Sequence, residues 1–175
     1  MALSSEETEV VLRAPTRADG AALHALIRRC PPLDLNSVYA YFLVCDHFRE
    51  TTVLAEMDGN LVGCVTGYRP PPHPDTMFIW QVAVDAPARG RGLAGKMLTA
   101  VMDRPAVEGV CWMETTISPS NTASRRLFAS WAAARSLEMQ ETTYLEAEDF
   151  LPAGADAVHE AERLFRIGPI PNGKS

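Results

Sequence analysis

Two patterns of hydrophobic and polar residues alternate along the chain. Short apolar runs rich in β-branched and aromatic residues predict strands, and stretches whose apolar residues recur every three or four positions predict helices. The predicted strands cover residues 9–14, 51–57, 61–68, 76–84, 109–115, 139–145 and 163–167. The predicted helices begin near residues 17, 36, 93 and 121. The resulting order, β-α-α-β-β-β-α-β-α-β-β, indicates a mixed α/β fold.

The strand at residues 76–84 leads into a glycine-rich turn that opens a helix. Asp85-Ala-Pro87 turns the chain, and Arg89-Gly-Arg-Gly92 follows before apolar residues at helical spacing. Backbone N–H groups at a helix start have no partner within the helix and lie at the positive end of its dipole, so they suit a pyrophosphate. Neither the Walker motif nor the dinucleotide fingerprint fits this spacing. An ordinary strand-to-helix turn with its arginines in solvent explains the same pattern.

Composition narrows the classes of function. The 175 residues are 47% hydrophobic and 22% charged, so we expect residues 1–175 to form one globular domain. The formal net charge of -6 argues against nucleic acid or an anionic membrane as the main partner. The first residues are polar and acidic, unlike a signal peptide, and no apolar run is long enough to span a membrane.

Cysteine and histidine spacing gives no sign of a metal site or a disulfide framework. The four cysteines include no CxxC pair, which predicts reduced thiols in a cytoplasmic protein. The four histidines lack the spacing of metal ligands, so we expect no metal. A cysteine nucleophile would have no histidine nearby in the sequence to support it.

The glycine-rich turn resembles a known cofactor loop. Arg89-Gly-Arg-Gly92-Leu-Ala94 is similar to the [Gln/Arg]-x-x-Gly-x-[Gly/Ala] signature of the GNAT-type N-acetyltransferases, which holds the pyrophosphate of coenzyme A. The resemblance implies a mixed, mostly antiparallel twisted sheet with helices on both faces and a splay between the fourth and fifth strands, where acetyl-CoA enters. It implies that the cofactor contacts the strand at Val82, Ala83 and Val84 and the loop at Arg89, Gly90, Arg91, Gly92, Leu93, Ala94 and Gly95.

A second pattern of that family is matched with one departure. Asn121-Thr-Ala-Ser124-Arg-Arg-Leu127-Phe128 is similar to Asn-x-x-Ala-x-x-Leu-Tyr, which implies that Asn121 and Ser124 lie beside the coenzyme A arm. A helix cap and a small packing residue explain the same two positions. Phe128 stands where many relatives have a tyrosine that protonates the departing thiolate, and phenylalanine has no proton to give. Either another group supplies the proton or the thiolate leaves into water.

Three longer segments resemble one branch of the family more closely. Residues 31–56, 76–85 and 112–121 are similar to the L-2,4-diaminobutyrate N-acetyltransferases of ectoine biosynthesis, and the likeness runs from about Val11 to Leu145. It implies acetylation of the γ-amine of diaminobutyrate by acetyl-CoA, which gives a precursor of the compatible solute ectoine.

Such an acceptor carries two ammonium groups and one carboxylate, so its pocket needs acidic or carbonyl groups and a donor. Asp34 and Asn36 lie in the turn that overhangs the acceptor side in this fold, and Tyr39 is a further candidate of the same region. Turn and cap chemistry explains the first two equally well. Trp80 lies on one of the two splayed strands and is either a ligand contact or a core residue.

Glu114 is the candidate general base, acting on the amine directly or through a water molecule. Strand alternation places Glu114 and Trp112 on one face. A carboxylate on an apolar strand needs a cationic partner or a cleft, so a structural salt bridge is the alternative.

Two other functions stay open from the sequence. One is a GNAT enzyme for another small amine or a protein N-terminus, and the other is a non-catalytic acyl-CoA-binding domain, which the missing tyrosine favours. The apolar strand edges predict a homodimer.

Overall fold

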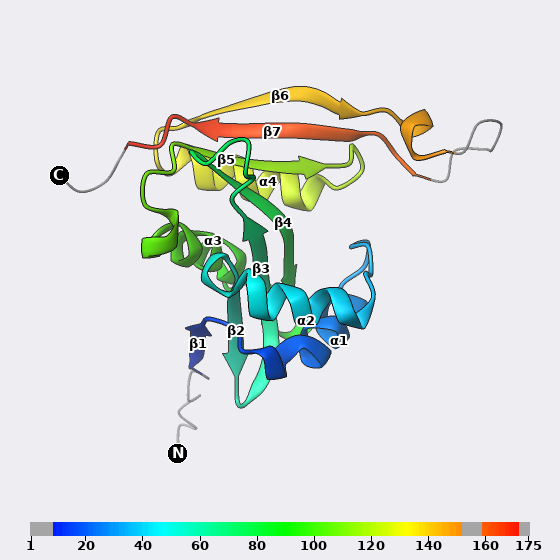
Figure 1. Ribbon diagram of the computed structural model, residues 1–175, viewed down its shortest axis with the longest axis vertical. Coiled ribbons are helices and arrows are strands. Elements are labelled where there is room, and N and C mark those ends of the chain that lie inside the picture. The colour runs from blue at the N-terminus through cyan, green and yellow to red at the C-terminus, as the bar shows by residue number, and fades with distance from the viewer. Residues whose placement is uncertain (1–8, 152–158, 172–175) are drawn as a thin grey trace, which may run out of the picture. The chain divides into compact units, whose positions relative to one another are not determined.

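The computed structural model describes residues 9–151 and 159–171 of the chain (Figure 1). Within these residues the backbone forms two units. The first unit comprises the chain up to Thr66 together with Gln81–Arg104, and the second comprises Gly67–Trp80 together with the chain from Pro105. Strands β3 (Asn60–Tyr68) and β4 (Thr76–Val84) run through the boundary between them. The hydrogen-bonded strand order is β1-β2-β3-β4-β5-β7-β6.

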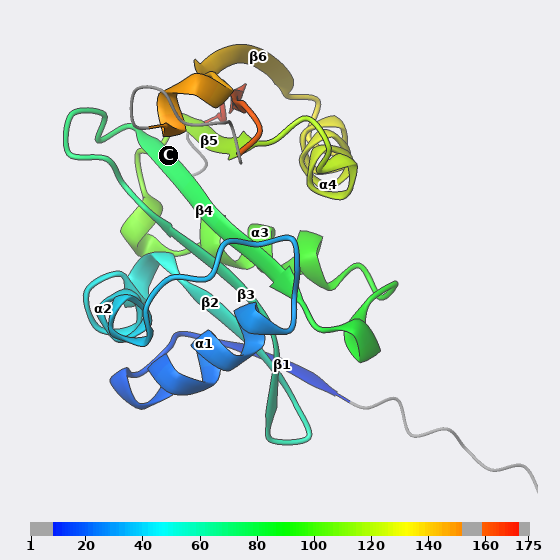
Figure 2. The same ribbon diagram turned by 90° about the vertical axis from the view of Figure 1, so that its right-hand side faces the viewer.

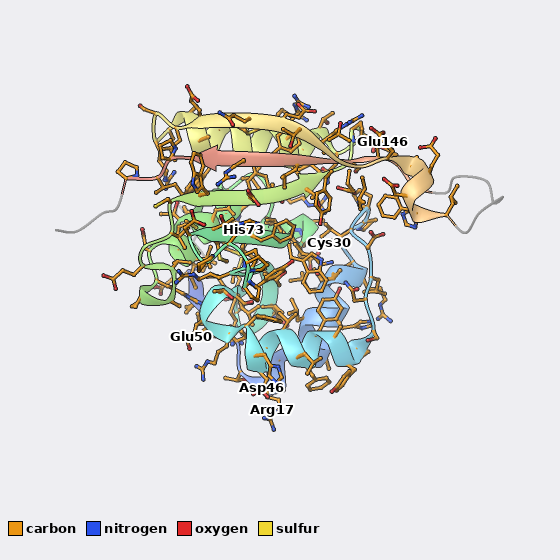
Figure 3. All side chains as sticks on the ribbon, turned by 45° about the horizontal axis from the view of Figure 1, so that its top comes forward. Arg17, Cys30, Asp46, Glu50, His73 and Glu146 are labelled. Atoms are coloured by element: carbon orange, nitrogen blue, oxygen red, sulfur yellow. The ribbon has the colours of Figure 1, made fainter. Side chains whose placement is uncertain are left out.

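The first unit contains an antiparallel ladder and three α-helices. Strand β1 pairs with β2 from Val10–Met57 onward, and β2 pairs with β3 from Val53–Val65 onward. Figure 2 shows α1 and α2 side by side in this unit. An ion pair of 2.7 Å between Arg17 and Asp46 ties the turn before α1 to α2 (Figure 3). The further elements are β1 (Val10–Arg13), α1 (Gly20–Arg28), α2 (Val38–His47), β2 (Val53–Met57) and α3 (Leu93–Met102).

Helices cover both faces of the first unit's strands. Leu54, Cys64 and Ala83 belong to the same buried cluster as the apolar side chains of α1 and α2. Neighbouring residues on a strand point to opposite faces, so Ala55 and Gly63 face the other way. A Cβ added at Gly63 would lie 2.9 Å from Met97 of α3, which shows that α3 packs closely on that second face.

The second unit is built around three strands and one helix. Strands β5 (Trp112–Ile117) and β6 (Glu138–Leu145) both pair antiparallel with β7 (Glu162–Gly168). Helix α4 (Thr122–Ala133) contacts β6 and buries Phe128, Trp131 and Ala132. Figure 1 shows α4 against one face of these strands.

The parallel pairing of β4 with β5 covers only the beginning of each strand. The register runs from Thr76–Trp112 to Phe78–Glu114, and both strands continue beyond it, β5 as far as Ile117. Ile79 and Trp80 thus extend past the paired residues within the second unit. A ladder of only three residue pairs is expected where the fourth and fifth strands splay apart.

The sequence predicted the order of the elements correctly, and the mixed α/β sheet with mostly antiparallel pairing is confirmed. Two strand starts were wrong, because β5 begins at Trp112 and not at residue 109, and β2 begins at Val53 and not at residue 51. Gly109 has a φ of 78°, and the N–H groups of Cys111 and Trp112 both donate to the Asp75 carbonyl. Val110 and Cys111 therefore belong to the connection that leads into the strand. No helix in the described ranges is long and apolar enough to cross a membrane.

Candidate functional site

The glycine-rich loop follows β4 in the first unit and is held in a defined conformation. Asp85 begins a 3-10 turn at Ala86–Ala88, and its Oδ1 accepts a hydrogen bond of 2.9 Å from the Ala86 N–H. Arg89 Nε donates to the Val84 carbonyl at 2.9 Å. Gly90 and Gly92 have φ values of 77° and 68°, a left-handed conformation that favours glycine. The loop therefore owes its shape to these glycines and to two short hydrogen bonds.

The backbone N–H groups of residues 90–95 have no acceptor among the described residues. The first hydrogen bond of α3 runs from the Lys96 N–H to the Gly92 carbonyl at 3.1 Å. Gly92 is the N-cap of the helix and has no side chain that accepts a hydrogen bond. Arg89 and Arg91 are exposed beside these groups. Free N–H groups at the positive end of a helix dipole, flanked by guanidinium groups, form an anion site that fits a pyrophosphate.

An ion pair fastens this loop to the end of α1. Arg29 Nε and Nη2 both donate to Asp85 Oδ2, at 3.0 and 2.9 Å. The same guanidinium donates to the Ala25 and Leu61 carbonyls at 3.1 and 3.4 Å. Arg29 thus joins the helix, β3 and the start of the loop. No local pattern in the sequence indicates this contact, because Arg29 and Asp85 lie 56 positions apart.

The turn between α1 and α2 lies in the same unit. Ser37, not Asn36, caps α2, because its Oγ accepts a hydrogen bond of 3.3 Å from the Ala40 N–H. The Asn36 N–H donates to the hydroxyl of buried Tyr41 at 3.3 Å. Asp34 is exposed, and its carboxylate makes no hydrogen bond or ion pair with any described residue. The side chains of Asp34 and Asn36 are therefore not used as the turn and cap groups that the alternative explanation requires.

Tyr39 and Trp80 are surface residues, with 70% and 41% of their area exposed. The exposure of Trp80 argues against a core role. Gln81 follows Trp80 and is buried, and its Nε2 donates to the Asp34 carbonyl at 2.8 Å. Sequence reasoning missed Gln81, although a polar residue inside an apolar strand was a visible signal.

Glu114 lies in the second unit and has a cationic partner. Its Oε1 is 3.5 Å from Arg166 Nε, and its side chain is 16% exposed. Arg166 lies opposite Glu114 in the β5–β7 register, and its Cζ is 4.2 Å from the centre of the Trp112 ring. Trp112 and Glu114 share the half-exposed face of β5, as strand alternation predicted. This arrangement supplies the structural salt bridge that was the alternative to a catalytic role.

Asn121 and Ser124 also lie in the second unit and have a structural contact. Asn121 is the N-cap of α4, and its Oδ1 accepts a hydrogen bond of 3.1 Å from the Ser124 N–H. Phe128 follows on the same helix and is buried, with 2% of its area exposed. The site residues named from the sequence thus divide between the units. The loop, residues 82–84, Asp34, Asn36 and Tyr39 belong to the first, and Trp80, Glu114, Asn121 and Ser124 to the second.

Three of the cysteines are buried, and none of the four forms a disulfide. Burial raises the pKa of Cys64 to about 12 and that of Cys45 to about 11. Burial also raises the pKa of Cys30, which follows α1 (Figure 3). These thiols stay protonated near neutral pH and are poor nucleophiles. In the described ranges no group of three or more His, Cys, Asp or Glu side chains is arranged to hold a metal ion.

Comparison with known proteins finds acetyltransferases. The model of the acetyltransferase (GNAT) family matches residues 21–132. An L-2,4-diaminobutyric acid acetyltransferase from Bordetella parapertussis is 46% identical over 160 residues, which cover 91% of this chain and 84% of the relative. One from Streptomyces avermitilis is 47% identical over 158 residues, which cover 89% and 86%.

A solved structure extends the likeness to the fold. The diaminobutyrate acetyltransferase EctA from Paenibacillus lautus was determined in complex with its substrate L-2,4-diaminobutyric acid and coenzyme A. It is 45% identical to this chain, with a TM-score of 0.89, and the alignment covers 96% of this chain and 99% of that one.

Proposed function

The chain belongs to the acetyltransferase (GNAT) family, and from this premise we propose that it transfers the acetyl group of acetyl-CoA to the γ-amine of L-2,4-diaminobutyrate. The observation that carries the proposal is the near-complete alignment, in sequence and in fold, with an enzyme bound to that substrate and to coenzyme A. The product is N-γ-acetyldiaminobutyrate, a precursor of ectoine.

Acetyl-CoA supplies an activated acetyl group as a thioester. The free N–H groups of residues 90–95 hold its pyrophosphate, and Arg89 and Arg91 add positive charge. Residues 82–84 line the pantetheine arm, and a backbone N–H near Val82 polarises the thioester carbonyl. Asn121 and Ser124 contact the same arm. The support for the loop is its conformation, because its glycines have positive φ values and its N–H groups lack internal acceptors.

The acceptor is held by charge and by hydrogen bonds. Asp34, with help from Asn36, binds the α-ammonium and carboxylate end, and its carboxylate has no competing partner among the described residues. Tyr39 and Trp80 expose aromatic surface, which suits contact with the aliphatic part of a small ligand. The two-carbon spacer then sets how far the second nitrogen reaches.

Glu114 acts as the base that prepares the amine, directly or through a water molecule. A lysine-like amine has a pKa of about 10.4, so only roughly one molecule in a few thousand is neutral at about pH 7. A site that deprotonates the bound amine would lower the activation free energy by on the order of 4–5 kcal/mol. Attack on the thioester is direct, within a ternary complex, and needs the nitrogen within roughly 3–3.5 Å of the carbonyl carbon. Phe128 supplies no proton to the departing thiolate.

An acetyl-CoA turnover assay with a panel of amines tests the proposed function. Release of free thiol should depend on the amine and should be fastest with diaminobutyrate. Diaminopropionate should be too short, and ornithine and lysine too long, each losing more than the ~1–3 kcal/mol typical of one methylene. Product NMR should show acetylation at the γ-nitrogen alone. An α-acetyl product, or equal turnover of diaminobutyrate and lysine, would contradict the proposal. Preferred turnover of a peptide would indicate a protein N-terminus as the acceptor.

We further propose that both units form one catalytic domain, since the family match crosses every boundary between them. The enzyme works in the cytoplasm, which the cysteines support because none of the four forms a disulfide. It acts as a homodimer, for which the edge strand β6 and its Tyr144, 55% exposed, offer a surface. Light scattering on the purified chain measures the oligomeric state.

A further inference from the structure

Gln81 is a buried polar residue of β4, and only one of the two polar atoms of its side-chain amide has a hydrogen-bond partner. Only 5% of its area is exposed, and its backbone N–H donates to Thr66 Oγ1 at 3.1 Å. The side-chain Nε2 donates to the Asp34 carbonyl at 2.8 Å, whereas Oε1 is buried and accepts no hydrogen bond. The orientation of the amide follows from this contact, because a flipped amide would place two carbonyl oxygens against each other.

A buried carbonyl oxygen without a donor is unfavourable, because it has lost its hydrogen bonds to water and gained none in return. Among the described side chains only three buried polar atoms have no hydrogen-bond partner, namely Gln81 Oε1, Thr52 Oγ1 and Arg166 Nε. Arg166 Nε faces a carboxylate, and Thr52 precedes β2, where its carbonyl accepts a hydrogen bond from Arg104. Gln81 is therefore the one of the three that has an unfilled acceptor and a direct contact with the turn at Asp34.

That turn is held by two buried side chains and presents an unpaired charge. Gln81 binds the backbone of Asp34, and the hydroxyl of Tyr41 accepts the N–H of Asn36 at 3.3 Å. The Asp34 carboxylate is exposed and free of partners among the described residues. Because Oε1 and Nε2 belong to one planar amide, Oε1 lies close to the Asp34 backbone. An acceptor oxygen beside an acidic residue suits a group that carries N–H donors and disfavours a carboxylate.

We infer that Gln81 Oε1 accepts a hydrogen bond from the α-ammonium group of the amine substrate, beside Asp34. This inference rests on the proposed function and names a further specificity-determining residue for it. The ligand fills the acceptor that the free protein leaves unsatisfied. A substrate without the α-amine, such as 4-aminobutyrate, leaves the oxygen buried and unpaired, and is therefore selected against.

Calorimetry with diaminobutyrate, in the presence of coenzyme A, tests the inference on variants of Gln81, Asp34 and Thr52. Gln81→Met is nearly isosteric and removes the oxygen, so it should weaken diaminobutyrate binding by at least about tenfold. In the Asp34→Asn protein, Gln81→Met should weaken binding by at least about fivefold more, because Oε1 binds the ligand directly and not through Asp34. Thr52→Val is the matched control, since it removes another unsatisfied buried oxygen and should leave diaminobutyrate affinity unchanged. Coenzyme A affinity should be the same in all of these variants.

The double variant separates ligand binding from the positioning of Asp34. If the amide served only to hold the Asp34 carbonyl, Gln81→Met would have no further effect in the Asp34→Asn protein, and that result would overturn the inference. Wild-type affinity in Gln81→Met would also overturn it. In the wild type, diaminobutyrate should bind far more tightly than 4-aminobutyrate, and Gln81→Met should narrow the ratio. A wild-type protein that neither binds nor acetylates diaminobutyrate would instead refute the proposed function itself, and this inference with it.

Discussion

Replacing Gly92 by valine is the most direct test of the loop as the coenzyme A site. Gly92 has a φ of +68°, and a Cβ built on it meets no atom within 4 Å. The cost to the free protein is therefore backbone strain and not a clash. Left-handed backbone costs a non-glycine residue ~1–2 kcal/mol, and a β-branched side chain fits it poorly. A domain with ~5–15 kcal/mol of stability survives this loss.

The loss of binding free energy for acetyl-CoA should be much larger. The valine side chain would project into the space above the free N–H groups of residues 90–95, where the pyrophosphate is expected. A hydrogen bond to a charged group contributes ~1.5–3 kcal/mol, so the loss of two amounts to ~3–6 kcal/mol. Acetyl-CoA affinity should then fall by about two to four powers of ten.

Gly59 provides the matched control. It has a φ of +72° in the turn between β2 and β3, and a Cβ there also meets no atom within 4 Å. Gly59→Val should cost similar stability in urea unfolding and leave acetyl-CoA binding by calorimetry unchanged. A folded Gly92→Val protein that binds acetyl-CoA as tightly as the Gly59→Val protein would refute the assignment of the loop.

Two further predictions concern charged pairs. Glu114→Gln should keep acetyl-CoA affinity but lower kcat/KM for the amine by at least about tenfold, or ~1.4 kcal/mol. Wild-type kinetics across about pH 7–9 would instead leave Glu114 with only its salt bridge to Arg166. The hydrogen-bonded Arg13 guanidinium lowers the pKa of Asp19 from 3.8 to about 2, so this pair stabilises the fold above about pH 4 and loses its effect as the pH falls through about 2. Asp19→Asn should lower the free energy of unfolding by ~1–2 kcal/mol near neutral pH and flatten its pH dependence in that window, and urea unfolding with an unchanged pH slope would contradict this.

The elements that the sequence predicted well are those with strong local signals. Strand β4 was predicted with its observed bounds, because eight of its nine residues are apolar or β-branched and the run ends before Asp85, which caps the next turn. The start of β5 was wrong because Val110 and Cys111 are apolar but follow a left-handed Gly109, so the chain turns where the composition favours a strand. Hydrophobicity reports burial, and a buried turn has the same composition as a buried strand.

The contacts that hold the candidate site together join residues that are far apart in the sequence. Arg29 binds Asp85 across 56 positions, and Gln81 binds the Asp34 backbone across 47. The identity of Arg29 or Gln81 does not specify a partner, because such pairs exist only after the helices and strands have packed. The sequence could therefore name the loop and the acidic turn, but not the side chains that hold each of them in place.

These contacts also decide which groups attract the anionic cofactor in a chain whose formal net charge is -6. The Arg29 guanidinium is neutralised by Asp85, and Arg89 is directed to the Val84 carbonyl through Nε. Arg91 has no partner among the described residues, so it is the guanidinium that is free to meet a phosphate. Most of the attraction must then come from the backbone N–H groups, whose position depends on the left-handed glycines. For this reason we expect the glycine at position 92 to matter more for acetyl-CoA binding than any single arginine near it.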